Sequence, residues 1–462
     1  MKTERNDTVA AVATARGTGG VAIIRISGEN ALSIAKKVFR FSNEKAEIKP
    51  RYVYFGNIIS NGTVTDSGLF TYFKAPASYT GEDVVEISCH GGVLVTDTVL
   101  SAVLSAGARL ATAGEFTKRA FINGKLLLDE AESVGDIIEA DSERALVAAA
   151  ANLLSGTGKS LLAEKEILKE VLARFFAVID WPDEDIEEDG KGELLSKLYR
   201  VSKRFSSLIS TAKNGIAVKN GIKTVIAGCA NAGKSTLMNA LANCERSIVT
   251  SVAGTTRDVI SEAVTVGGVK LILSDTAGIR ESDDVVEKIG IERAVKEIEA
   301  AELIIFTVDI SKPFSSEERS LADFISRQKK PTVTVFTKSD LAPLADVEAA
   351  ARELSPENAP FLSVSAKNGE GIARLSEIIA ELSGLDKIKK NEPLILSQRQ
   401  YGCLSEAKAR LEAAIALIEQ DQPADMVAFE LEGVIDSLSS LDGTKTNEEI
   451  LATVFSKFCV GK

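Results

Sequence analysis

GCANAGKS, at residues 228–235, matches the pattern G-x-x-x-x-G-K-[ST] and decides the fold of the segment around it. The run KTVIAG (223–228) before it reads as a strand, and STLMNALAN (235–243) after it reads as a helix. A glycine-rich turn at such a junction lets backbone N–H groups surround phosphate oxygens, and the helix N-terminus adds positive potential. Lys234 would reach the β- and γ-phosphates and Ser235 would ligate Mg²⁺. The stretch therefore predicts a P-loop nucleotide site.

Further motifs follow in the order that a Ras-like GTPase requires. GTTRD (254–258) supplies Thr256 as a second hydroxyl for Mg²⁺, and DTAG (275–278) places an acid at a strand end and a glycine N–H near the γ-phosphate. TKSD (337–340) and SAK (365–367) each end another strand. The predicted nucleotide-binding residues are Asn231, Ala232, Gly233, Lys234, Ser235, Thr236, Thr250, Ser251, Val252, Ala253, Gly254, Thr255, Thr256, Asp275, Thr276, Ala277, Gly278, Thr337, Lys338, Asp340, Ser365, Ala366 and Lys367.

Asp340 selects the base in this prediction. A carboxylate accepts both N1–H and the exocyclic amine of guanine, whereas adenine would leave the charge unpaired, so the ligand is GTP rather than ATP. Thr337 stands where GTPases usually carry Asn. Its hydroxyl can still hold the neighbouring loop, so we expect guanine specificity with modest affinity.

The pattern of apolar and polar residues changes along the chain. Residues 1–120 mix strands and helices and predict an α+β domain. Residues 221–384 alternate short β-rich runs with helical stretches, as in a mostly parallel sheet with crossover helices. Residues 121–220 and 385–462 have helical periodicity, and we expect them to form one discontinuous helical domain into which the GTPase domain is inserted.

Composition excludes several classes of protein. A formal net charge of −12 offers nucleic acid no general attraction, so contacts to it would need a local basic patch. His90 is the single histidine, which excludes a His-cluster metal site and makes a Ser-His-Asp hydrolase improbable. The five cysteines form no close pair, no apolar run is long enough to cross a membrane, and the start resembles no signal peptide. We expect a cytoplasmic protein.

The DTAG loop raises a question about hydrolysis. The next residue in Ras-like proteins is a Gln that orients the attacking water, and here it is Ile279, which has no polar side-chain atom. Arg280 is one alternative stabiliser of charge. Several acids follow, and spacing does not choose among them: Glu281, Asp283, Asp284, Glu287 and Glu292.

The chain resembles the MnmE (TrmE) family of tRNA-modification GTPases over almost its whole length. The stretches that carry the resemblance are GGVAIIRISG (19–28), GEDVVEISCHGG (81–92), GEFTKRAFINGKLLLDEAE (114–132), NAGKSTLMN (231–239), IVTSVAGTTRD (248–258), DTAGIRESDDVVEKIGIERA (275–294) and FCVGK (458–462). Other GTPases share only the P-loop-domain motifs. The resemblance implies that a bound K⁺ takes the place of an arginine finger, held by Asn231, Thr250, Val252 and Thr255, and that Glu287 orients the water.

The resemblance also implies a second site. The N-terminal domains of the family resemble tetrahydrofolate-binding modules and bind 5-formyltetrahydrofolate as a one-carbon donor. Residue-by-residue matching carries that site to Arg25, Glu86, Lys125 and Lys462. A carboxylate can read the ring N–H groups while Arg and Lys meet the acid groups. Cys459 has a supporting role in this interpretation, with a nucleophilic role as the alternative.

The implied function is GTP hydrolysis that, together with the flavoprotein MnmG, adds a carboxymethylaminomethyl or aminomethyl group to C5 of the wobble uridine of certain tRNAs. The resemblance further implies a homodimer through the N-terminal domain and a heterotetramer with MnmG. Two rivals remain open. One is a regulatory or ribosome-assembly GTPase without one-carbon chemistry, and the other is a folate-dependent transferase whose nucleotide site has no role.

Overall fold

The computed structural model describes residues 7–43, 47–181, 188–244, 261–274, 295–342, 346–385 and 393–461. The chain divides into two compact units: Met1–Gly135 with Gly156–Ser202 and Cys403–Lys462, and Asp136–Ser155 with Lys203–Gly402. Helices α4 (Leu128–Glu139), α8 (Glu188–Asn220) and α14 (Gln398–Glu419) contribute residues to both units.

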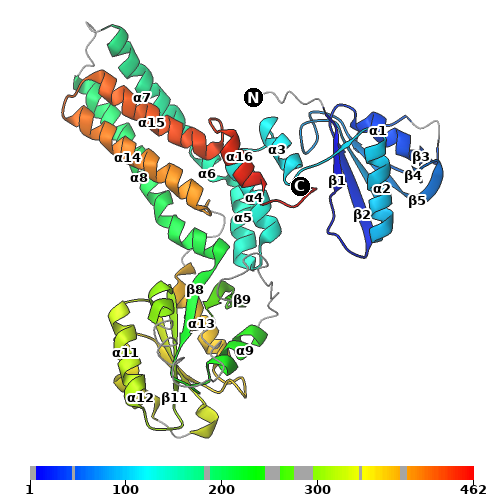
Figure 1. Ribbon diagram of the computed structural model, residues 1–462. Coiled ribbons are helices and arrows are strands. Elements are labelled where there is room, and N and C mark those ends of the chain that lie inside the picture. Colours follow the sequence, from blue (N-terminus) through cyan, green and yellow to red (C-terminus); the bar gives the residue numbers. More distant parts are fainter. Residues whose placement is uncertain are drawn as a thin grey trace. The chain divides into compact units, whose positions relative to one another are not determined.

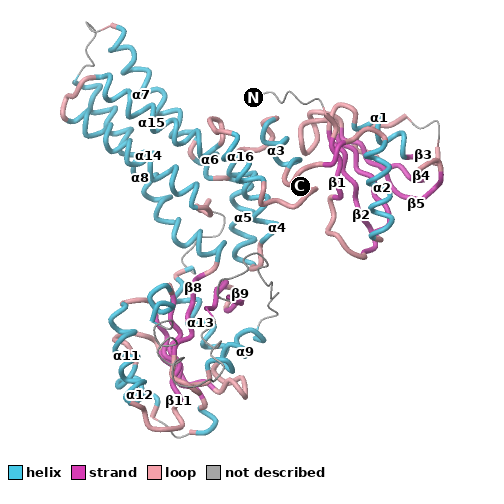
Figure 2. The backbone as a smooth tube through the Cα atoms, in the orientation of Figure 1, coloured by secondary structure: helices cyan, strands magenta, loops and turns pink. Residues whose placement is uncertain are grey.

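The N-terminal part of the first unit is built on a sheet of seven strands in the order β3-β4-β5-β6-β2-β1-β7 (Figures 1 and 2). Its strands are β1 (Val9–Val12), β2 (Gly19–Ser27), β3 (Phe39–Phe41), β4 (Val53–Ser60), β5 (Thr63–Phe73), β6 (Val84–Gly91) and β7 (Arg109–Leu110). All the pairings are antiparallel except that of β1 with β7. Helices α1 (Ala31–Val38) and α2 (Val93–Ser105) follow β2 and β6.

The two faces of this sheet are covered differently, because side chains alternate along a strand. Ala10, Ile24 and Ile87 lie on one face and form a core with buried residues of α1 and α2, such as Ile34 and Val99. The other face carries Val9 and Ala11, which pack with Phe116 of α3 (Glu115–Ile122). The second face is therefore only partly closed by apolar packing, and it is the face on which a polar site can form.

The helical part of the first unit pairs α7 (Leu162–Asp180) with α15 (Ala424–Asp442), which lie side by side in Figure 1. The buried apolar residues of α15 recur at spacings of four and three, as a packed helix seam requires: Val427, Leu431, Val434 and Leu438. Lys165 near the start of α7 pairs with Asp442 at the end of α15, at 2.8 Å with both side chains buried. Short helices α6 (Thr157–Ser160) and α16 (Glu448–Phe455) complete this part.

The second unit contains a sheet of six strands in the order β13-β12-β11-β8-β10-β9. The strands are β8 (Ile222–Ala227), β9 (Ser261–Val266), β10 (Val269–Ser274), β11 (Leu303–Asp309), β12 (Thr332–Thr337) and β13 (Phe361–Val364). Every pairing is parallel except the edge hairpin of β9 with β10. The sheet is buried on both faces, as parallel sheets are. Its strands accordingly read as continuous runs of buried, mainly apolar residues such as LIIFTVD.

Helices cover both faces of this sheet. α9 (Lys234–Cys244) and α13 (Ile372–Ser383) pack on one core, through residues such as Leu241 and Ile379. α11 (Ser316–Gln328) and α12 (Val347–Leu354) pack on the other, through Ile325 and Leu354. A 3₁₀ turn, η1 (Ser339–Leu341), follows β12. This doubly covered, mostly parallel sheet confirms the predicted P-loop GTPase fold.

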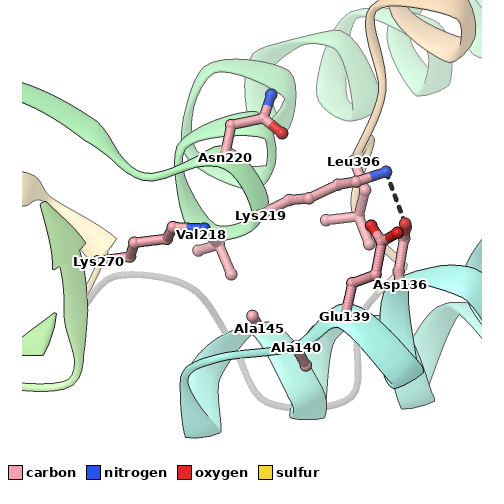
Figure 3. A pocket seen from close by; sticks show the side chains of 9 residues that line it. All are labelled: Asp136, Glu139, Ala140, Ala145, Val218, Lys219, Asn220, Lys270 and Leu396. Carbon is pink, nitrogen blue, oxygen red and sulfur yellow. Dashed lines mark ion pairs between the residues drawn. The ribbon is translucent and has the colours of Figure 1, made fainter. Parts of the chain in front are cut away.

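The same unit includes the end of α4, α5 (Glu143–Ser155) and the end of α8. Figure 3 shows Lys219, just before β8, paired with Asp136 of α4 at 2.6 Å. Lys270 of β10 pairs with Asp141 at 2.6 Å. These ion pairs line or border a cavity of about 180 Å³. They tie the amino-terminal ends of β8 and β10 to the α4–α5 segment.

The fold class is confirmed as α+β, helical and α/β parts. Strands β1, β3, β7 and β9 are elements that sequence reasoning did not identify. Among the helices that the structure describes, none is both long and apolar enough for a membrane span.

Candidate functional site

The P-loop lies at the carboxyl end of the central strand β8. Asn231 and Gly233 both adopt positive φ angles, of 60° and 85°, which bend the loop back on itself before α9 begins. The Lys234 ammonium donates to the backbone carbonyls of Gly228 at 2.9 Å and Cys229 at 2.8 Å. Burial lowers the pKa of Lys234. A partly desolvated cation is thus held inside a loop of suitable shape for phosphate.

Gly228 is required by close packing against the neighbouring strand. A Cβ at this position would lie 2.3 Å from the Thr307 hydroxyl and 2.5 Å from the Thr307 carbonyl oxygen. Thr307 is fully buried in β11 and donates to the Ala227 carbonyl at 3.0 Å. Gly228, the first residue of the P-loop, therefore packs closely against β11 and also continues directly from β8.

The TKSD loop stands next to the P-loop. The Thr337 hydroxyl donates to the Ala232 carbonyl at 2.7 Å, and the Val308 carbonyl lies 3.1 Å from the same oxygen. Thr337 is 2% exposed, so its side chain points into the loop junction and away from solvent. The hydrogen bond to Ala232 is therefore a specific contact through which Thr337 can hold the neighbouring loop, as the sequence leads us to expect.

The residues predicted to meet the guanine base are brought together. The Asp340 carboxylate is on an exposed residue and accepts a hydrogen bond of 2.8 Å from the buried Ser365 hydroxyl. Ala366 is partly buried against the core, and Lys367 is exposed. Ser365 thus orients the Asp340 carboxylate through one of its two oxygens.

Two of the side chains predicted to meet the metal ions are in the described part of the chain: Ser235 at the start of α9 and Asn231 in the P-loop. Ser235 and Thr236 are exposed in the first turn of α9, and Asn231 is exposed at the loop's tip. Oxygen-bearing side chains of this kind suit hard cations such as Mg²⁺ and K⁺. The remaining predicted residues lie outside the described residues: Thr250, Ser251, Val252, Ala253, Gly254, Thr255, Thr256, Asp275, Thr276, Ala277, Gly278 and Glu287.

A second candidate site lies on the polar face of the N-terminal sheet. Arg25 of β2 and Glu86 of β6 stand directly opposite each other and form an ion pair at 2.8 Å. The Arg25 guanidinium lies 5.5 Å from the ring centroid of Tyr79 and 5.7 Å from that of Phe116. Burial raises the pKa of Tyr79, whose hydroxyl pairs with Thr117 at 2.9 Å. The predicted pair is therefore half-buried and framed by two aromatic rings, which suits a flat polar ring system.

One other predicted residue of this site, Lys125, lies at the loop that carries Tyr79. Lys125 donates to the Pro76 carbonyl at 3.0 Å, so it is anchored to that loop. The terminal segment reaches the same domain: Val460 bridges to Ala113, and Gly461 lies so close to Val12 that a Cβ there would be 2.0 Å from its carbonyl oxygen. Cys459 is exposed, and Lys462 lies outside the described residues.

A cluster of charges holds α3 against this sheet. Arg119, which is 7% exposed, pairs with Asp7, Glu82 and Glu115 at 2.8 to 3.1 Å. Arg109 pairs with Glu115 at 2.6 Å and with Asp7 at 2.8 Å. Burial raises the pKa of Glu115, but hydrogen bonds from Arg109, the Thr112 N–H and Arg119 outweigh it and lower the pKa to about 2. The cluster positions the helix that supplies Phe116 and Thr117 to the candidate site.

Comparison with known proteins identifies the family. The N-terminal residues 8–125 match the model of the GTP-binding protein TrmE N-terminus, and residues 128–459 match that of the MnmE helical domain. The chain is 39% identical over 460 residues to the "tRNA modification GTPase MnmE" of Clostridioides difficile, with 99% of each chain covered. The chain belongs to the MnmE family of GTPases. A relative from Thermotoga petrophila with the same name is 40% identical over 457 residues, covering 99% of this chain and all of that one.

Solved structures add a more distant similarity. The G domain of the T. maritima FeoB iron transporter is 28% identical over 35% of this chain and 98% of its own length, with a TM-score of 0.27. The assignment to the MnmE family rests on the relatives and the family models alone.

Three residues near the two sites were not found by sequence reasoning. Tyr79 and Phe116 carry no signal in the sequence, because their proximity to Arg25 depends on tertiary packing. Asp309 had a signal: it ends a strand of a parallel sheet, the position where such sheets present functional side chains.

The Glu115 cluster makes a prediction about acid stability. In the folded state the pKa of the Glu115 carboxyl is about 2, below its ordinary value of 4.5. The stability that the ionised carboxylate contributes is therefore complete above about pH 4.5 and is lost as the pH falls towards 2. We expect the difference in melting temperature between wild type and Glu115→Gln, measured by circular dichroism, to be largest near neutral pH and to shrink in acid. Glu170→Gln, at an exposed position on α7, is the control that should follow the wild type. A difference that stays constant with pH would contradict this account.

Proposed function

We propose that the chain is a K⁺-activated GTP hydrolase that acts with MnmG to add a carboxymethylaminomethyl or aminomethyl group to C5 of the wobble uridine of certain tRNAs. The one-carbon unit would come from 5-formyltetrahydrofolate. The relatives' name as tRNA modification GTPases supports the tRNA substrate. The observation that carries the nucleotide part is the meeting of the P-loop and the TKSD loop through Thr337 and Ala232.

The roles of the nucleotide-binding residues follow from their positions. Lys234, now bound to two P-loop carbonyls, would exchange these acceptors for the β- and γ-phosphates. The Ser235 hydroxyl, with Thr256, would hold Mg²⁺. Asp340, oriented by Ser365, would accept the two N–H donors of guanine. Together these contacts bind and orient the triphosphate.

Hydrolysis needs positive charge where the transition state develops negative charge. A K⁺ ion between the phosphates would supply it, with Asn231, Thr250, Val252 and Thr255 as its ligands. Asn231 supports this role because it is exposed and held at a positive φ angle. Glu287 would orient the water through a second water molecule, in place of the missing Gln.

The one-carbon site is proposed on the polar face of the N-terminal sheet. The half-buried pair of Arg25 and Glu86 would exchange part of its mutual contact for the ligand, with Glu86 reading ring N–H donors and Arg25 meeting an acid group. Lys125 and Lys462 would add positive charge for the glutamate tail. Cys459 is exposed beside this domain and would support the tail's docking.

The assembly is proposed from the family. It comprises a homodimer through the N-terminal domain, residues 1–120, and a heterotetramer with MnmG, which carries the flavin. The helical domain would comprise 121–220 and 385–462, with the G domain at 221–384. K⁺ would bring the two G domains of the dimer together across their nucleotide faces, and hydrolysis would release them. The chain would work in the cytoplasm.

The cation mechanism is tested by GTP hydrolysis in Na⁺, K⁺ and Rb⁺. We expect fast turnover in K⁺ and Rb⁺ and slow turnover in Na⁺, because the smaller ion fits a K⁺ site poorly. Asn231→Ala should lose the cation dependence and retain only the slow rate, a loss of roughly 10²-fold if the ion is a major source of transition-state stabilisation. Asn358→Ala is a matched control, because Asn358 has a similar φ angle of 62° in the same domain. Equal rates in all three cations would contradict the mechanism.

The folate site is tested by calorimetric titration with 5-formyltetrahydrofolate. Arg25→Met should weaken binding by about tenfold or more, since it removes a charge-assisted contact from a partly buried site. Arg40→Met, at an exposed position on β3, should bind as the wild type does. If the wild type itself shows no binding, the chain is instead a regulatory GTPase without one-carbon chemistry.

A further inference from the structure

Asp309 is a buried acid at the carboxyl end of β11, beside the loop that reads the base. It is only 2% exposed. It stands opposite Thr337 in the parallel pairing of β11 with β12, so it reaches the start of the TKSD loop directly. A buried carboxylate is costly unless it is fully paired, so its partners indicate what it stabilises.

The two carboxylate oxygens of Asp309 have different partners. Oδ1 accepts from the Ser311 N–H at 3.0 Å and from the Ser311 hydroxyl at 2.6 Å, which forms a local turn. Oδ2 accepts from the Lys338 ammonium at 2.7 Å, while Lys312 lies farther away at 3.7 Å. Burial raises the pKa of Asp309, but the bonds from Lys338 and Ser311 outweigh it and lower the pKa. The carboxylate is therefore the charged partner of Lys338.

Lys338 lies between the two functional ends of the loop, directly after Thr337 and two residues before Asp340. Thr337 before it holds the P-loop, and Asp340 after it is the proposed guanine reader. Lys338 has a φ angle of 58° and ψ of 36°, a left-handed conformation that residues with a Cβ rarely adopt. The surrounding contacts must hold a residue in such a conformation. The Asp309–Lys338 pair is one such contact, since it links the side chain of the strained residue to a buried anchor on another strand.

We infer that Asp309 is a positioning residue for guanine recognition: by anchoring Lys338 it holds the left-handed turn that directs the Asp340 carboxylate towards the base. The inference rests on the proposed role of Asp340. Asp309 itself touches no ligand in this account. The Lys338 ammonium has three donors, so it can keep its bond to Asp309 and still offer donors to a nucleotide.

The test compares the affinities for GDP and IDP. Hypoxanthine has the N1–H of guanine but lacks the exocyclic amine, so the ratio of the two dissociation constants reports how well Asp340 meets the base. Asp309→Asn keeps an oxygen for the Ser311 turn and removes the charge that holds Lys338. We expect GDP affinity to fall by about five- to tenfold and IDP affinity to fall less, so that discrimination decreases.

Two further variants make the result specific. Lys338→Met breaks the same pair from its more exposed side and should lower discrimination similarly, and the double variant should be no worse in discrimination than either single one. Lys312→Met removes the distant, half-exposed cation and should leave the ratio unchanged. Equal weakening of GDP and IDP binding by Asp309→Asn would show a purely structural role and overturn the inference, as would tighter GDP binding. If wild type does not prefer GDP to IDP, the proposed role of Asp340 fails instead.

Discussion

The hydrogen bond from the Thr337 hydroxyl to the Ala232 carbonyl is the contact on which the nucleotide site depends. It joins the loop that would hold the phosphates to the loop that would read the base. Parallel strands bring both loops to the same edge of the sheet, but that alone does not set their separation. The buried hydrogen bond fixes the separation of the two loops. Ala232 is only 1% exposed, and leaving its carbonyl without a hydrogen-bond partner would cost considerable free energy.

In the N-terminal domain, buried polar groups are also paired with one another. There the paired groups are charged side chains and not a hydroxyl and a backbone carbonyl. Arg119 is almost inaccessible and is matched by three carboxylates, and Arg25 is matched by Glu86 between two aromatic rings. Breaking such a pair leaves an uncompensated charge, so the geometry around each is well defined. The chain's last described residues pack against β1 and the loop after β7, which places the terminal motif in the domain of the second candidate site.

Much of the fold could be predicted from the sequence, because continuous apolar runs and 3.6-residue periodicity are local signals. Strand β9 was missed although its signal was present: SEAVTV and VKLILS are separated by Gly267 and Gly268, both with positive φ, as a tight hairpin requires. The P-loop could be located because its residues are consecutive.

Contacts between distant residues could not be predicted in this way. The pairing of Arg25 with Glu86 depends on the register of β2 against β6, and the approach of Tyr79 depends on a loop conformation. The inward direction of the Thr337 side chain likewise follows from the packing of three strands. Sequence reasoning therefore predicts candidate site residues from consecutive motifs, but it does not predict supporting residues such as Tyr79 and Phe116, which only the tertiary fold brings to them.

The most direct test of the account is the affinity of Thr337→Val for guanine nucleotides. Valine keeps the shape of the side chain and removes only the hydroxyl that binds Ala232. The account predicts that the variant folds and that its affinities for GDP and GTP both fall by about tenfold, because the buried carbonyl loses its partner and the two loops lose their fixed separation. Unchanged affinity for both nucleotides in a correctly folded variant would contradict it.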